Sequence, residues 1–339
     1  MAYAHAMVLG NDGVISRRPA AWFQLRAGIK PRVAIYAHGG LNSAAESLQR
    51  IRILAPYFYA NGIHPLFISW ETSVLETLRD IMADHMSRRR QALTDAVDRV
   101  IEMVAGPFLK PIWSEMKQNA ALALEDGHGL EVLAQALTRL YASLPGFEIH
   151  LVGHSAGAVL LGHLLTRLGA GGIGVASCSL FAPACDFEFT RQHYGAAIDS
   201  QRLSLGHFHL HVLSDQRELQ DSVGPYRKSL LYLVSHALEN NYRTPLLGLA
   251  RAVAATSAAA LREDWYPGSV GQVQQWQQMW RRGPELLHVV TAAQVSTGTL
   301  GPWVRATHGS FDNSAEVINM TLSEILGGQP VWPIEWLDY

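Results

Sequence analysis

Short apolar segments alternate with longer segments of helical periodicity along most of this chain, and this alternation is the strongest restriction on its fold. Nearly all of the apolar segments are continuous, as in strands that are buried on both faces of a sheet. The alternation predicts an α/β fold in which helices flank a mostly parallel central sheet. The predicted strands cover residues 32 to 38, 64 to 70, 147 to 153, 175 to 181, 207 to 213 and 286 to 291.

Signals for helix ends lie between the predicted strands. Ser43 and Glu46 have the spacing of a capping box, in which each side chain binds the other residue's backbone N–H, so a helix should begin there. Apolar residues recur at helical spacing from Leu93, which predicts an amphipathic helix. Residues 314 to 326 repeat the pattern and end at two glycines, which predicts a last helix that covers the sheet.

Two segments are longer than a strand-helix-strand connection requires, namely residues 72 to 145 and residues 222 to 285. Both have helical patterns, so we expect a single domain of residues 1 to 339 with two helical insertions. Insertions near catalytic loops commonly form lids or substrate walls. The large apolar residues of these segments could contact an apolar or aromatic ligand, and they would equally suit ordinary packing. These residues are Trp113, Leu133, Leu137, Tyr141, Leu230, Leu231, Tyr232, Trp276 and Trp280.

The charge and cysteine content argue against several classes of partner and compartment. With 27 Lys and Arg against 29 Asp and Glu, the chain has no basic excess of the kind that nucleic acid binding requires. No apolar run reaches the roughly 18 to 20 residues of a membrane-spanning helix, and the first 19 residues indicate a hairpin and not a secretory signal. Cys178 and Cys185 lie in or beside an apolar run, which favours reduced thiols. We expect a soluble, cytoplasmic protein with a small ligand, and the sequence leaves its oligomeric state open.

The motif GHSAG at residues 153 to 157 lies between a predicted buried strand and an apolar helix. This is the context of a nucleophile elbow, a turn so tight that side chains at the flanking glycines would collide with neighbouring backbone. Ser155 would be held there in a strained conformation that presents its hydroxyl, at a helix N-terminus that stabilises negative charge. The motif therefore predicts Ser155 as a nucleophile.

The motif AHGGL at residues 37 to 41 ends an earlier predicted strand. Acyl transfer needs two backbone donors aimed at the developing oxyanion, and a glycine-rich turn lets the backbone approach the substrate. We expect the N–H of Gly40 or Leu41, together with that of Ala156, to form this oxyanion hole. The alternative is a strand-to-helix turn that merely needs glycine.

A nucleophilic serine needs a general base, and the expected chain order is serine, acid, histidine. His308 satisfies this order, because it lies in a polar, glycine-containing loop after the last predicted strand and before the last helix. Most of the 15 histidines must be structural, so position is the argument for His308. His38 and His154 are better interpreted as supports of their turns.

Four aspartates are candidates for the carboxylate that orients the base. Asp215 directly follows the strand at residues 207 to 213, one strand before His308, and is the favoured candidate. Asp186 is the alternative, although its place after Pro183 suggests a helix cap or a loop hydrogen bond. Asp221 lies further from a strand end, and Asp312 is well placed to cap the final helix.

Three histidines, His207, His209 and His211, alternate along one predicted strand and raise the question of a metal site. Alternate residues of a strand lie about 6.6 to 7 Å apart, too far for all three to reach one ion easily. We therefore expect them to be polar neighbours in the core or under a helix. Neither a metal nor an organic cofactor is predicted.

Together the motifs resemble those of the α/β-hydrolase superfamily over most of residues 30 to 327. The resemblance rests on GHSAG, AHGGL, LHVLSD and ATHGSFD. It implies an eight-stranded, mostly parallel sheet and cofactor-free hydrolysis through an acyl-enzyme. Many members carry a cap after the strand that follows the nucleophile strand, whereas residues 182 to 206 are short here and the extra chain lies in the two insertions.

The expected function is that of a serine hydrolase that cleaves a carboxylic ester, on a small molecule with an apolar or aromatic group. Ser155, His308 and Asp215 would form its triad. An acyltransferase is the first alternative, because it would use the same triad and exclude water from the acyl-enzyme. A non-catalytic binding module on the same fold ranks last, because such a module would usually have lost the serine or the histidine.

Overall fold

An eight-stranded sheet forms the centre of the computed structural model, which describes residues 5–10, 12–17, 30–39, 44–70, 95–255, 257–282 and 286–337. The strand order is β2-β1-β4-β3-β5-β6-β7-β8. Within the described residues, seven strands run parallel and only β2, at one edge, is antiparallel. The strands are β1 (Ala6–Leu9), β2 (Ile15–Arg17), β3 (Arg32–Ala37), β4 (Ile63–Trp70), β5 (Glu148–His154), β6 (Ser177–Phe181), β7 (Phe208–Leu213) and β8 (Leu287–Val290), and β9 (Gln294–Ser296) and β10 (Trp303–Arg305) form a separate hairpin.

All six strands expected from the apolar segments are present, as β3, β4, β5, β6, β7 and β8. The central strand β5 is buried along its length except at its first residue, and β6 is buried throughout, as expected for strands covered on both faces. The hairpin expected at the N-terminus is also confirmed, because β1 and β2 pair antiparallel. The predicted α/β class with a mostly parallel sheet is therefore confirmed.

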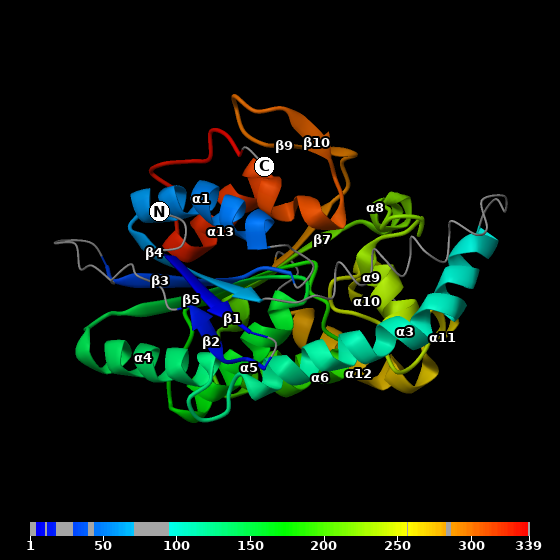
Figure 1. Cartoon of the computed structure of the whole chain (residues 1–339), viewed down its shortest axis with the longest axis horizontal. Coiled ribbons are helices and arrows are strands. Elements are labelled where there is room, and N and C mark those ends of the chain that lie inside the picture. Colours follow the sequence, from blue (N-terminus) through cyan, green and yellow to red (C-terminus); the bar gives the residue numbers. More distant parts are fainter. Residues whose placement is uncertain are drawn as a thin grey trace.

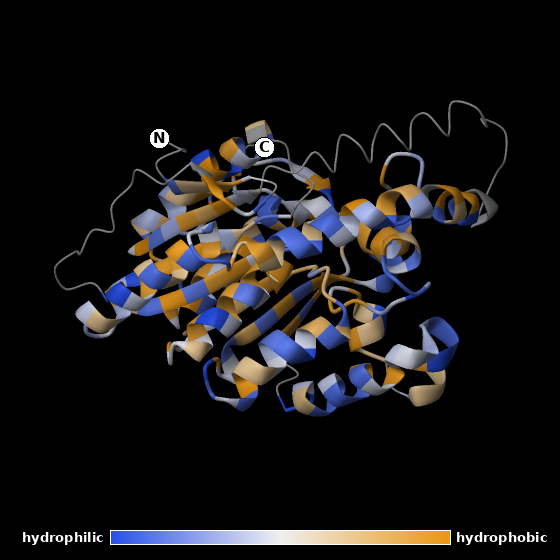
Figure 2. Ribbon diagram, turned by 60° about the horizontal axis from the view of Figure 1, so that its bottom comes forward, coloured by the Kyte–Doolittle hydropathy of each residue, from blue (hydrophilic) through white to orange (hydrophobic). Residues whose placement is uncertain are grey.

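Helices cover both faces of the sheet (Figure 1). Helices α1 and α13 lie over one face, and α4, α5, α6 and α12 lie over the other. The strands between these layers are largely apolar in Figure 2. The helices are α1 (Ala44–Ala60), α3 (Asp95–Leu122), α4 (Gly129–Ser143), α5 (Gly157–Ala170), α6 (Phe187–Thr190), α7 (Ala196–Asp199), α8 (Asp215–Gln220), α9 (Leu230–Leu233), α10 (Ala250–Val253), α11 (Ala258–Asp264), α12 (Val270–Trp280) and α13 (Ala315–Leu326).

The ends of the predicted helices agree with the signals in the sequence where the structure describes them. Helix α13 begins after Ser314, whose side chain accepts the N–H of Val317, and ends at Gly327 in the left-handed conformation with φ +66°. Helix α1 begins at Ala44, and the predicted cap at Ser43 lies outside the described residues. No helix among the described residues is long and apolar enough to cross a membrane.

The described parts of the two predicted insertions are helical and contact each other. Helix α3 packs closely against the turn that follows α9, where an added Cβ at Gly106 would lie 3.1 Å from the carbonyl oxygen of Ala237. The indole N–H of Trp113 donates to Glu239 at 2.6 Å, and Lys117 pairs with the same carboxylate. Of the nine large apolar residues named from the sequence in these segments, eight are buried and Tyr141 is exposed, which favours packing as the role of most of the nine.

Candidate active site

The turn between β5 and α5 has the strained backbone that was expected at Ser155. Ser155 has φ +53°, a left-handed conformation that a side-chain-bearing residue rarely adopts. A Cβ at Gly157 would collide with the carbonyl oxygen of Ala37, and one at Gly153 would lie 2.9 Å from Leu161 Cδ1. Gly157 is therefore required by the close approach of the turn to β3, a Cβ at Gly153 would need the Leu161 side chain to shift, and Ser155 carries the strain between the two glycines.

The structure brings Ser155 and His308 together from positions 153 residues apart. The Nε2 atom of His308 lies 2.9 Å from Ser155 Oγ, and both residues are buried. His308 opens a 3₁₀ turn, His308–Asn313, whose start is held by reciprocal side-chain bonds between Thr307 and Ser310. A histidine nitrogen at this distance can take the serine proton directly.

Burial controls the protonation of His308. The pKa of this imidazole is lowered to about 3, chiefly by desolvation and in addition by the neighbouring His154, while the Asp312 carboxylate opposes both. The ring is therefore neutral at neutral pH and is able to accept a proton. Its other nitrogen, Nδ1, is buried and has no hydrogen-bond partner among the described residues.

Asp215, the carboxylate favoured from the sequence, lies elsewhere. It is the first residue of α8, where its Oδ1 accepts the phenol of Tyr232 at 2.5 Å and its Oδ2 lies 3.3 Å from Arg251. No hydrogen bond or ion pair joins it to His308. The structure therefore does not bring the favoured acid to the predicted base.

The other three aspartates differ in their partners. Asp186 caps α6 by accepting the N–H of Phe189 at 2.7 Å, the role that its place after Pro183 suggested. Asp312 is buried in an ion pair with Arg50. Asp221, directly after α8, accepts the backbone N–H of His308 at 2.8 Å through Oδ2. Among these four candidates, Asp221 is the one that is hydrogen-bonded to His308.

Two further histidines support the turns of the site. Nε2 of His154 donates to the carbonyl oxygen of His308 at 2.9 Å, and the centroids of the two rings are 5.3 Å apart. Nδ1 of His38 donates to the carbonyl oxygen of Gly39 at 2.8 Å, while its Nε2 bonds to Ser47. Both contacts agree with the supporting roles expected from the sequence.

The predicted oxyanion residues are described in part. Gly40 and Leu41 lie outside the described residues, but Gly39 is so close to Ser155 that an added Cβ would lie 3.2 Å from Ser155 Cβ. Ala156 immediately precedes α5, and its backbone N–H donates to no other described residue. A donor at this helix N-terminus suits a developing negative charge on an atom bound to Ser155.

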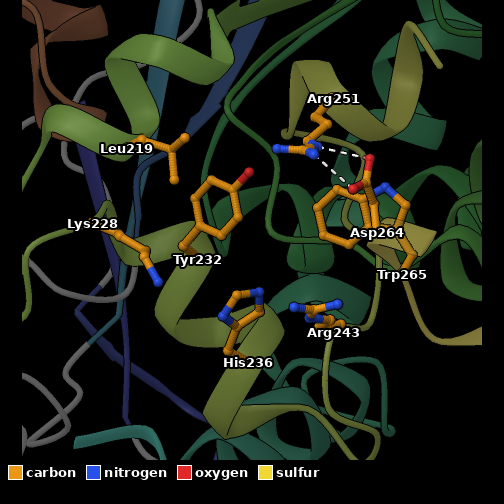
Figure 3. A pocket seen from close by; sticks show the side chains of 8 residues that line it. All are labelled: Leu219, Lys228, Tyr232, His236, Arg243, Arg251, Asp264 and Trp265. Atoms are coloured by element: carbon orange, nitrogen blue, oxygen red, sulfur yellow. Dashed lines mark hydrogen bonds and ion pairs between the residues drawn. The ribbon is translucent and has the colours of Figure 1, made fainter. Parts of the chain in front are cut away.

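A polar cavity of about 160 Å³ lies within the second insertion and the segment that precedes it (Figure 3). Arg251 spans one side of it and binds both oxygens of Asp264, at 2.8 and 2.6 Å. Tyr232 and Arg251 also hold Asp215, so Asp215 is a structural partner of this cavity. Neither Ser155 nor His308 lines the cavity, which is formed by Leu219, Lys228, Tyr232, His236, Arg243, Arg251, Asp264 and Trp265.

Comparison with known proteins adds no relative to this picture. No protein-family model matches the chain, and no curated protein or solved structure is significantly similar to it. The α/β architecture and the buried Ser155–His308 contact are therefore the observations on which a function can be argued.

Proposed function

We propose that this protein is a serine hydrolase with an α/β-hydrolase fold that cleaves a carboxylic ester through an acyl-enzyme. The observation that carries the proposal is the 2.9 Å contact between His308 Nε2 and Ser155 Oγ, made from a turn in which Ser155 has φ +53°. This turn follows the carboxyl end of β5, the edge of a parallel sheet at which α/β proteins bind their ligands. The mostly parallel eight-stranded sheet supports the same assignment.

The reaction follows from the positions of these groups. His308 removes the hydroxyl proton as Ser155 Oγ attacks the ester carbonyl, and the oxyanion that forms accepts the N–H of Ala156 and a donor of the glycine-rich turn after β3. Collapse of this intermediate breaks the carbon–oxygen bond, and the imidazolium of His308 gives its proton to the departing alcohol. Water, deprotonated by the same imidazole, then attacks the acyl carbon. The bond to Ser155 Oγ breaks, His308 returns the proton to Oγ, and the acid is released.

Asp221 is the carboxylate that we assign to the orientation of His308. It already accepts the backbone N–H of His308 at 2.8 Å, and it precedes His308 in the order of serine, acid and histidine. Nδ1 of His308 has no hydrogen-bond partner among the described residues, so it is available to such a carboxylate. Burial raises the pKa of Asp221, while the N–H groups of His308 and Ser222 lower it.

The proposed substrate is a small-molecule ester. Ser155 and His308 are only 6% and 7% exposed, so the reacting carbonyl must enter a narrow, largely dry space. An apolar or aromatic acyl group suits such a space better than a charged one, because the transfer of a charge out of water is costly. The two helical insertions remain the proposed source of the walls around it.

A fluorophosphonate probe tests the nucleophile directly. The probe should label one serine per chain, and peptide mapping should place the label at Ser155. The Ser155→Ala variant should lose the label, His308→Gln should take it up far more slowly, and Ser204→Ala, which changes an exposed serine, should label as the native chain does. Labelling that persists in Ser155→Ala would contradict the proposal.

A further inference from the structure

Three histidines converge on one carboxylate on the face of the sheet that α13 covers. His209 and His211 are two residues apart on β7, so both point to the same face. His211 pairs in register with His288 of β8, which brings a third imidazole to that face. Glu324 of α13 lies against all three rings.

The distances within this cluster are short, and two of its nitrogens have no hydrogen-bond partner in the described part of the chain. His209 Nδ1 and His288 Nε2 each lie 3.5 Å from Oε1 of Glu324. Both nitrogen atoms are buried, and neither makes a hydrogen bond to a described residue. A cluster that served only as a polar network would be expected to satisfy such buried atoms, because leaving them unpaired is costly.

The spacing fits a small divalent ion. Zinc lies about 2.0 to 2.2 Å from imidazole nitrogens and carboxylate oxygens, so neighbouring ligand atoms of a tetrahedral site are about 3.3 to 3.5 Å apart. The two distances of 3.5 Å agree with this value, and the three ligand atoms all lie within 4.8 Å of one another. We propose that His209, His288 and Glu324 form a binding site for a divalent transition metal such as zinc.

Two neighbours hold the carboxylate ligand in place. His211 Nε2 donates to Glu324 Oε1 at 3.1 Å, and Ser179 of β6 donates to Oε2 at 2.5 Å. Hydrogen bonds of this kind commonly orient the ligands of metal sites. His211 therefore acts as a positioning residue, and three protein ligands leave a fourth position for water or another donor.

The donor set also suits such an ion. Imidazole nitrogens and carboxylate oxygens are common ligands of zinc and related transition metals. His209 and His288 supply two imidazole nitrogens to this cluster, and Glu324 supplies a carboxylate oxygen.

The site lies where a metal would tie the last helix to the sheet. Its ligands come from β7, β8 and α13, and α13 directly follows the turn that carries His308. His207, the histidine that completed the strand pattern in the sequence, lies in the 3₁₀ turn before β7 and is exposed. Strand pairing and the helix, and not the run of three alternating histidines, therefore assemble the proposed site.

Cobalt binding to the metal-stripped full-length protein tests the proposal without reference to catalysis. One equivalent of Co²⁺ should bind per chain, produce visible absorption bands, be displaced by Zn²⁺, and raise the thermal midpoint, because a ligand that binds the folded state stabilises it. His288→Asn and Glu324→Gln should weaken binding on the order of 100-fold or more, since even second-layer partners of metal ligands contribute about 10- to 100-fold. His207→Asn is the matched control on the same segment and should bind as the native chain does.

Two outcomes would overturn the metal site. One is a native chain that takes up no Co²⁺, and the other is binding that survives in both ligand variants or is lost in His207→Asn. If the ligand variants do not fold, X-ray absorption of the native cobalt complex decides the question. Two imidazole nitrogens and a carboxylate oxygen around the ion would support the site, and fewer than two imidazoles would contradict it.

Discussion

The segments that follow β5 and β7 carry two parts of the candidate site, and they are built in different ways. After β5, the chain turns within three residues into α5, and the collisions that a side chain at Gly153 or Gly157 would make leave little freedom. After β7, the chain first forms α8 and only then reaches Asp221. This residue contacts His308, which lies 87 residues further along the chain. The first segment is a tight turn packed against β3, and the second depends on a contact with a distant loop.

This difference explains why the functional residue of the first segment is easier to predict from the sequence than that of the second. The position of Ser155 follows from a strand, two glycines and a helix that are adjacent along the chain. The carboxylate cannot be placed in this way, because Asp215 and Asp221 both follow β7 and only the tertiary structure separates their partners. Substitutions in the two segments should therefore have different effects.

The largest effect is expected from the nucleophile. Ser155→Ala should lower turnover of a short-chain nitrophenyl ester by at least about 10³-fold, because loss of a triad nucleophile removes the acyl-enzyme route. The thermal midpoint should not fall, because alanine keeps the Cβ and removes a buried hydroxyl group. Turnover above about a hundredth of the native rate, measured beside Ser204→Ala, would show that Ser155 is not the nucleophile.

The second prediction separates the two aspartates after β7. Asp221→Asn should lower kcat on the order of 10⁴-fold with little change in KM, because loss of the orienting charge favours the wrong histidine tautomer. Asp215→Asn should change kcat less than about tenfold and lower the thermal midpoint, since it weakens the contacts to Tyr232 and Arg251. If Asp215→Asn were inactive while Asp221→Asn kept its activity, Asp215 and not Asp221 would be the acid that orients His308.

The third prediction concerns the acid limb of activity. The base must be unprotonated to act, and burial lowers the pKa of His308 to about 3, so protonation should remove activity only well below the ordinary histidine pKa of 6.5. The rate constant kcat/KM, measured in short assays, should thus stay nearly constant as the pH falls from 7 to 5. An acid limb with its midpoint near 6.5 would mean that His308 is solvated, that a carboxylate at its Nδ1 raises its pKa in the working enzyme, or that it is not the base.

The smallest effect is expected from Glu218, which lies on α8 between the two aspartates. Burial raises its pKa to about 8, so the folded state holds a proton that the unfolded state releases above about 4.5. Stability from this group is present below pH 4.5 and is lost as the pH rises through 8. Glu218→Gln should therefore raise the thermal midpoint by a few degrees at pH 8.5 and change it little at pH 4.5.

Glu316→Gln, which changes an exposed glutamate, is the control for that measurement and should leave the midpoint nearly unchanged at both pH values. An equal gain in Glu218→Gln at pH 4.5 and pH 8.5 would show that the effect comes from packing. In that case Glu218 would not be held protonated by burial.

Local signals account for the parts of the molecule that the sequence predicts well. The apolar runs identify six parallel strands, because burial on both faces requires continuous apolar residues. The capping pattern and Gly327 mark the last helix correctly. The pairing of Ser155 with His308 is also expected from their order along the chain, and the structure places their reactive atoms 2.9 Å apart.

Long-range contacts account for what the sequence does not reveal. The cluster of His209, His288 and Glu324 needs the register of β7 with β8 and the packing of α13, and none of these is visible as a spacing motif. The partner of Asp221 likewise depends on where the His308 turn meets the end of α8. Gly40 and Leu41 lie outside the described residues, so their oxyanion role stays a prediction.

The central claim is that Ser155 forms an acyl-enzyme, and rapid-quench analysis with a nitrophenyl ester tests it most directly. Nitrophenol should appear in a burst of one equivalent per chain, while the quenched protein gains the mass of one acyl group on the peptide that contains Ser155. His308→Gln should suppress both the burst and the adduct. Turnover without a burst or adduct, or an acyl group on another residue, would contradict the account.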